Sequence, residues 1–189
     1  MTNKEIITMS ELDRIIKSRK SMSAGEMEDL LNSCPEWVEQ NREREARHRA
    51  RAEQRAAEMM PEMRPLETAL REAGFEFQTL SDFVNSDQSF PAAIPIFLKH
   101  LQTATHATLR TVIGRCLSGS DARGLAGPVL VKELKRNVDG PDVRWLFANA
   151  FTATATQEDV EGLQELIADS RNESIRERLQ TALKSASKR

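Results

Sequence analysis

The sequence of 189 residues is poor in several residue types, and each shortage excludes a class of protein. Its two cysteines, Cys34 and Cys116, lie far apart, so neither a disulfide framework nor a cysteine-rich zinc site is expected. Tyrosine is absent and aromatic residues make up 5% of the chain, which disfavours an all-β fold because strands are rich in these residues. The net charge of −2 lacks the basic excess of a protein that binds nucleic acid over its whole surface.

Recognisable catalytic and metal-binding patterns are also missing. The three histidines, His48, His100 and His106, show no ligand spacing with a nearby carboxylate, and the chain has no phosphate-binding glycine loop and no nucleophile elbow. We therefore predict no catalytic residues, no metal, no cofactor and no enzymatic activity. The most apolar stretch, residues 90–98, is too short to span a bilayer, and the first residues lack the apolar core of a signal peptide. These features predict a soluble, cytoplasmic protein without membrane contacts.

Helix-start and helix-stop signals are dense, whereas no alternation of Val, Ile and Thr indicates a strand. Several Ser or Thr residues stand three positions before an acidic residue, the spacing of a capping box that satisfies free backbone amides. These residues are Ser10, Ser23, Ser33, Thr156 and Ser170. We predict an all-α fold with helices over residues 10–19, 24–32, 35–60, 61–73, 80–84, 91–102, 108–117, 122–136, 141–152, 157–169 and 173–184.

A helical-hairpin motif recurs three times between residues 92 and 183. A shift of 33 residues aligns three sets of positions in the first helices: Ile94, Gly127 and Val160; Phe97, Leu130 and Leu163; Leu101, Leu134 and Ile167. The second helices share an aliphatic residue followed by Arg110, Arg144 or Arg176. A fixed period of this length predicts stacked units that bury their apolar faces against one another.

The pattern of a proline near the start of the first helix, a turn, and a second helix with an aliphatic-Arg pair and a later Ala-Leu pair resembles a HEAT-like repeat. The prolines are Pro95 and Pro128, and the third unit carries Ile175-Arg176 and Ala182-Leu183. The resemblance implies a short α-solenoid of about three HEAT-like hairpins. It also implies a ladder in which a turn aspartate bonds the second-helix arginine. Asp169 matches that aspartate, whereas Thr103 and Arg136 hold the equivalent places in the first two units. We expect the three arginines to serve this ladder rather than to bind an anion.

The chain divides in this interpretation into an N-terminal helical arm, residues 1–64, and a HEAT-like repeat domain, residues 65–189, whose first end is capped by the arm or by residues 66–84. The arm contains a helix that is polar almost all round, with six arginines set among glutamates: Arg42, Arg44, Arg47, Arg49, Arg51 and Arg55. Such a helix is either solvated and held by i,i+4 ion pairs such as Glu43–Arg47 and Glu45–Arg49, or an arm that docks on a partner or on a second copy. Nucleic-acid contact is disfavoured because the glutamates balance the arginines.

HEAT-like arrays expose the second helix of each pair on a concave surface, and the repeat alignment assigns residues to it. Trp145 is expected to be an anchor there, because tryptophan is enriched at binding hot spots; the alternative is that it packs between the first two repeats. The residues of this predicted face are Thr111, Arg115, Trp145, Asn149, Thr152, Glu177 and Lys184.

These patterns predict a non-catalytic protein-protein interaction module, an adaptor or assembly scaffold that uses the concave face and the arm. The alternative is a dedicated inhibitor, such as an immunity protein that occludes a toxin. A nucleic-acid-binding HEAT-like protein is the least favoured hypothesis.

Overall fold

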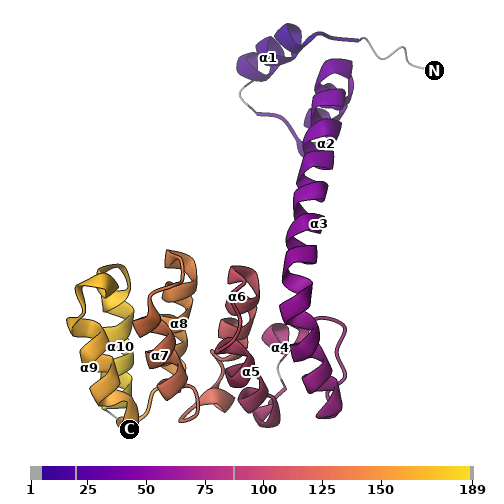
Figure 1. Ribbon diagram of the computed structural model, residues 1–189. Helices are drawn as coiled ribbons and strands as arrows, with labels where there is room; N and C mark the ends of the chain where they lie inside the picture. Colours follow the sequence, from indigo (N-terminus) through magenta and orange to yellow (C-terminus); the bar gives the residue numbers. More distant parts are fainter. Residues whose placement is uncertain (1–5, 20, 87, 188–189) are drawn as a thin grey trace. The chain divides into compact units, whose positions relative to one another are not determined.

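The computed structural model describes residues 6–19, 21–86 and 88–187. Ten α-helices and four short 3₁₀ helices make up this part of the chain, and no strand occurs in it, so the all-α prediction is confirmed (Figure 1). The chain forms two compact units, an N-terminal unit of residues Met1–Ala57 and a C-terminal unit of residues Glu58–Arg189. The sequence placed this boundary between residues 64 and 65.

The N-terminal unit begins with two short capped helices, α1 (Met9–Ser18) and α2 (Ala24–Asn32). Each starts with a capping box, Thr8 with Glu11 in α1 and Ser23 with Glu26 in α2. The sequence identified the second box, but its choice of Ser10 for the first was wrong, because the hydroxyl of Thr8 is the one that accepts the amide of Glu11. Ser33 is likewise no cap of the next helix, since its hydroxyl donates to the carbonyl of Leu30.

The longest helix, α3 (Pro35–Glu72), contributes residues to both units. The sequence predicted a break near residue 60, yet the helix continues through Pro61 and Pro65. A proline inside a helix lacks an amide donor and crowds the carbonyl four residues earlier, which for Pro61 is that of Ala57. The boundary between the two units falls directly after Ala57. Gly74, with φ of 86°, supplies the left-handed residue expected just beyond the end of α3.

The C-terminal unit contains three consecutive helix pairs, preceded by the last turns of α3 and by α4 (Ser81–Asn85). The pairs are α5 (Ile94–Leu101) with α6 (Ala107–Cys116), α7 (Gly127–Arg136) with α8 (Pro141–Thr154), and α9 (Val160–Ala168) with α10 (Arg176–Ala186). A short 3₁₀ helix precedes each pair, namely η1 (Pro91–Ala93), η2 (Ser120–Ala122) and η3 (Gln157–Asp159), and a fourth, η4 (Ser170–Ile175), lies within the third pair. α7 starts later than predicted because Gly124, with φ of 75°, separates η2 from it.

The helix pairs pack side by side in sequence order (Figure 1). α6 contacts α8 and α8 contacts α10, so the second helices form one row, and on the other side α7 contacts α9. The aligned positions of the sequence repeat form the core between the rows: Phe97, Leu130 and Leu163 are fully buried, as are the aliphatic residues before the repeat arginines. At roughly 1.5–3 kcal/mol for each fully buried large apolar side chain, this shared core is the main stabilising contribution to the unit.

The N-terminal end of this core is covered by the last turns of α3 and by α4. Leu66 and Leu70 of α3 and Phe83 of α4 belong to the same apolar cluster as the helix pairs. Phe83 makes edge-to-face contacts with Phe75, Phe77, Phe90 and Phe97, with centroids 5.1–5.7 Å apart. Residues 66–84 therefore cap the first helix pair, which is one of the two alternatives that the sequence left open.

Candidate functional site

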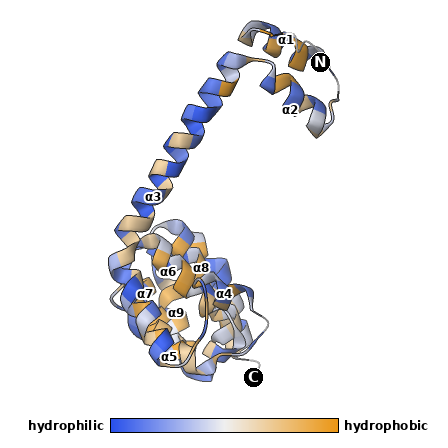
Figure 2. Ribbon diagram, turned by 90° about the vertical axis from the view of Figure 1, so that its right-hand side faces the viewer, coloured by the Kyte–Doolittle hydropathy of each residue, from blue (hydrophilic) through white to orange (hydrophobic). Residues whose placement is uncertain are grey.

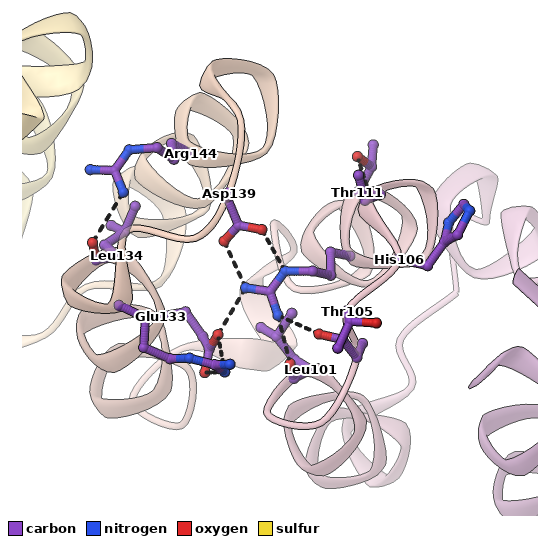
Figure 3. A network of polar contacts seen from close by, with 12 residues as sticks. Leu101, Thr105, His106, Thr111, Glu133, Leu134, Asp139 and Arg144 are labelled. Atoms are coloured by element: carbon purple, nitrogen blue, oxygen red, sulfur yellow. Dashed lines mark hydrogen bonds and ion pairs between the residues drawn. The ribbon is translucent and has the colours of Figure 1, made fainter.

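The buried guanidinium of Arg110 joins the first helix pair to the second, and Figure 3 labels its partners Leu101, Glu133 and Asp139. It donates to the carbonyls of Leu101 and Ala104 in its own hairpin, at 3.0 and 2.9 Å. It also binds Asp139 of the next hairpin with two bonds of 2.6 and 2.7 Å, and Glu133 at 2.8 Å. Burial alone would lower the pKa of Arg110, but the hydrogen bonds from its side chain to Asp139 and Glu133 raise it instead.

Arg144 repeats this arrangement one unit later. It donates to the carbonyl of Leu134 in its own hairpin and to the side-chain oxygen of Asn172 in the following one. Arg110 and Arg144 are thus buried structural groups, which confirms that they belong to a ladder rather than to an anion site. The predicted ladder aspartate is wrong, however: Asp169 pairs with Arg171, and Arg176 donates to the carbonyl of Ile167 and pairs with Glu173.

The true ladder acceptors lie three residues later in each turn than the positions that the resemblance suggested. Asp139 and Asn172 are 33 residues apart, the same spacing as the repeat. The equivalent position in the first turn is His106, whose backbone amide donates to Glu62 of α3 at 3.1 Å, alongside the amide of Thr105 at 2.8 Å. Glu62, which lies outside the repeats, therefore accepts the hydrogen bonds of the first turn.

Close packing of the second helices depends on a small residue. A Cβ atom on Gly114 of α6 would lie 3.0 Å from both Leu146 and Phe147 of α8. Such a contact is tighter than normal, so Gly114 allows α6 and α8 to approach. The outward side chains of neighbouring second helices are brought together as a result.

Trp145 lies on the outer surface of the second-helix row with 44% of its surface exposed. The guanidinium carbon of Arg178, on α10, stands 5.0 Å from the centre of its ring, a cation–π geometry. Trp145 therefore does not pack between the first two repeats. The sequence interpretation missed Arg178, although it lies 33 residues after Trp145, one repeat period away.

Two other predicted face residues meet at an open pocket of about 550 Å³. Arg115 of α6 and Asn149 of α8 line it together with Leu146, and the far wall comes from the loop around Phe90 and from Asp121. Asp121 accepts hydrogen bonds from the hydroxyl of Ser89 at 2.8 Å and from the amide of Phe90 at 2.6 Å, which holds that wall in place. Cys116 also borders the pocket, but burial raises the pKa of its thiol to about 12, so the thiolate form is suppressed at neutral pH.

The remaining predicted face residues are placed on the second helices without being joined to one another. The hydroxyls of Thr111 and Thr152 donate to backbone carbonyls of their own helices, at 2.9 and 2.7 Å. Glu177 and Lys184 are exposed on α10. Across the described residues Arg115, Arg178 and Lys184 form no ion pair, which distinguishes them from the ladder arginines.

The six arginines of the arm are exposed along α3. Arg47 pairs with Glu43 at 3.4 Å, which confirms one predicted i,i+4 bridge. Arg42 approaches Glu39 at 4.0 Å, and Arg55 donates to the carbonyl of Arg51. Glu45 accepts a hydrogen bond from Asn41 rather than pairing with Arg49. Arg44 also bonds Asn41. Exposed pairs of this kind contribute about 0–1 kcal/mol each.

Metal-binding clusters and membrane-spanning helices are both missing from the described part of the chain. It holds no group of three or more His, Cys, Asp or Glu side chains that could bind a metal ion. No helix in it combines the length and the apolar character needed to cross a bilayer. Comparison with protein-family models, with curated proteins and with solved structures gave no match.

Proposed function

We propose that this chain is a non-catalytic protein-binding module built as a short α-solenoid of HEAT-like hairpins. The partner binds across α6, α8 and α10, with Trp145 as the anchor. The observation that carries the proposal is the exposed ring of Trp145, over which the guanidinium group of Arg178 stands. Tryptophan and arginine are the side chains that most often dominate binding energy at protein interfaces.

The surroundings of Trp145 support this proposal. The arginines of the ladder are buried and bonded, so they stiffen the scaffold and leave recognition to the outer side chains. The cation–π contact restrains the Trp145 ring before binding, which lowers the entropy lost when a partner orders it. The open pocket lined by Arg115, Leu146 and Asn149 offers a hollow on α6 and α8 for a further side chain of the partner.

Quantitative affinity purification tests the proposal. The full chain and its Trp145→Ala variant would be expressed as bait in the native cells, and the recovered proteins compared by mass spectrometry. Val138→Ala is a matched control, because Val138 is 65% exposed and lies outside the second-helix row. We expect a specific protein to be recovered with the wild type and the control and lost with Trp145→Ala, at unchanged melting temperature. Equal recovery with all three baits would contradict the proposal.

Stoichiometry in the same experiment separates an adaptor from an inhibitor. An adaptor or assembly scaffold is expected to bring down several proteins or a larger complex. A dedicated inhibitor would bring down one partner at an equal molar ratio, and that partner would be toxic when expressed alone.

A further inference from the structure

The middle of α3 is exposed on every side, and its charges are unevenly distributed around the helix. Every residue from 42 to 57 is exposed, and blue dominates this stretch in Figure 2. At about 100° per residue, one half of the helix circumference between residues 37 and 55 carries four arginines and no acidic residue. This arginine face consists of Trp37, Gln40, Asn41, Arg44, Arg47, His48, Arg51, Ala52 and Arg55.

The glutamates of this part of α3 lie on the opposite half of the helix. That half carries Glu36, Glu39, Glu43, Glu45 and Glu53, together with Arg42 and Arg49. The glutamates balance the arginines in number, but not around the helix. The two sides of a helix with its side chains lie about 10–12 Å apart, which exceeds the Debye length of about 8 Å at physiological ionic strength. The positive potential of the arginine face is therefore largely uncancelled.

The arginine face does not serve to stabilise α3 by itself. Arg47 and Arg51 stand four residues apart, as do Arg51 and Arg55, and like charges at this spacing destabilise a helix. Among the described residues, Arg47 is the only arginine of the face with an acidic partner, Glu43 at 3.4 Å. Arg44 bonds a neutral side chain and Arg55 a backbone carbonyl. An external anion accounts for this arrangement better than internal ion pairs do.

The chemistry of the face favours a phosphate chain over an acidic protein. No lysine occurs between residues 21 and 98, so every full positive charge on α3 is a guanidinium, which can bond two phosphate oxygens at once. The core of a protein interface is poor in charge and rich in large apolar side chains. The arginine face offers Trp37 as its only large apolar side chain.

A single strand fits this face better than a duplex. A helix in the major groove, about 12 Å wide, has phosphates on both sides, so its glutamates would face phosphates too. A single strand can follow one side alone, and proteins that bind single strands combine basic side chains with aromatic rings on which bases stack. Trp37 borders an open hollow of about 330 Å³ at one end of the face. The hollow is lined by Trp37, Gln40, Asn41, Glu43, Arg44 and Arg47.

We propose that the arginine face of α3 binds the phosphate backbone of a single-stranded nucleic acid. The four arginines extend over about 16 Å of the helix, and each contacts a phosphate. Trp37 offers a stacking surface for a base at one end. All these residues belong to the N-terminal unit, so the site can fail or hold independently of the protein-binding surface around Trp145.

Fluorescence anisotropy of the full chain tests this proposal, with a labelled single-stranded RNA or DNA of about 20 nucleotides, longer than the roughly 4–16 nucleotides of such a site. The disrupting variant combines Arg47→Gln with Arg51→Gln. Its matched control combines Arg42→Gln with Arg49→Gln, the same charge change on the glutamate half. At physiological salt we expect the dissociation constant to rise about tenfold or more for the disrupting variant and less than about twofold for the control. Equal losses in the two variants, at unchanged helix content by circular dichroism, would overturn the proposal, as would a wild type that binds neither strand.

Salt dependence and competition test the chemistry of the site. For single strands, the logarithm of the binding constant falls with the logarithm of the salt concentration by about 0.7 per phosphate contact. Four contacts therefore predict a slope of about −3, and the disrupting variant should halve it. A duplex of the same sequence and polyglutamate should both compete weakly. Stronger competition by the duplex would show that α3 enters a groove, and stronger competition by polyglutamate would show that the face accepts an acidic protein; either result would overturn the proposal.

Discussion

Single buried residues connect neighbouring helix pairs in the C-terminal unit. Arg110 is 1% exposed, and each nitrogen of its guanidinium group has a hydrogen-bond partner. Two of the partner residues lie in its own hairpin and two in the next. A buried ion pair contributes little net stability when intact but leaves an uncompensated charge when one partner is removed. Arg110 is therefore the residue at which the stack should be most sensitive to substitution.

Replacement of Arg110 by Met should lower the free energy of unfolding by about 3–5 kcal/mol, because Asp139 loses the guanidinium bonded to it and the buried Glu133 keeps only Arg136 as a partner. Arg115→Met, on the same helix but exposed, is the control and should change it by less than about 0.5 kcal/mol. Urea denaturation followed by circular dichroism measures both. Similar midpoints for the two variants would show that Arg110 does not hold the pairs together.

The contribution of Glu62 to the stability of the fold should depend on pH. Burial tends to raise the pKa of Glu62, but hydrogen bonds from the side chain of Thr105 and from the amides of His106 and Thr105 lower it below its ordinary value of 4.5. A carboxyl group with a lowered pKa stabilises the fold fully above that ordinary value and loses the effect as the pH falls through its folded-state pKa. The wild type should thus exceed Glu62→Gln in unfolding free energy at pH 7, with the difference shrinking below about pH 4.5. A difference that stays constant into the acid range would contradict this role.

At the scale of elements, close approach between helices explains an irregularity in the repeat. Gly127 occupies a position where the other units have Ile94 and Val160. A Cβ atom there would lie 1.7 Å from the carboxylate of Asp159, which is buried in η3 and accepts the amide of Thr156 at 2.8 Å. The start of α7 therefore tolerates no side chain.

Gly127→Ala should destabilise the C-terminal unit by roughly 1–3 kcal/mol, since Asp159 must move out of its capping position. Gly119→Ala is the control, because its φ of −85° suits any residue and no atom lies within 4 Å of the added Cβ. Thermal melts of the two variants give the comparison. Equal melting temperatures would indicate that η3 yields without cost.

Most of the helices could be predicted from the sequence, but the contacts that join the helix pairs could not. Helical periodicity and capping signals located the helices because both signals are local. The burial of Phe97, Leu130 and Leu163 followed from the hairpin repeat. The ladder partners Asp139 and Asn172 were missed, since which turn residue reaches the next arginine depends on how the pairs stack. The continuous α3 was missed for a related reason: Pro61 and Pro65 oppose a helix locally, and packing of Leu66 and Leu70 outweighs them.

At the scale of the whole molecule, the C-terminal unit includes more of α3 than the sequence assigned to it. Met59 and Met63 pack against the apolar cluster, and Glu62 closes the first turn. A fragment of residues 58–189 should therefore unfold cooperatively and at a higher temperature than a fragment of residues 65–189. Circular dichroism melts of the two fragments test this, and equal melting temperatures would place the boundary at residue 65 instead.

The exposed ring of Trp145 is the central feature of the proposed binding surface. With Trp37 replaced by Phe, Trp145 is the only tryptophan in the chain, so its fluorescence reports on the second-helix row alone. Acrylamide quenching of this variant, before and after saturation with the partner recovered by affinity purification, is the most direct measurement. The account predicts efficient quenching in the free chain and strong protection in the complex. Quenching that is equally efficient in both states would show that the partner binds elsewhere and would contradict the central claim.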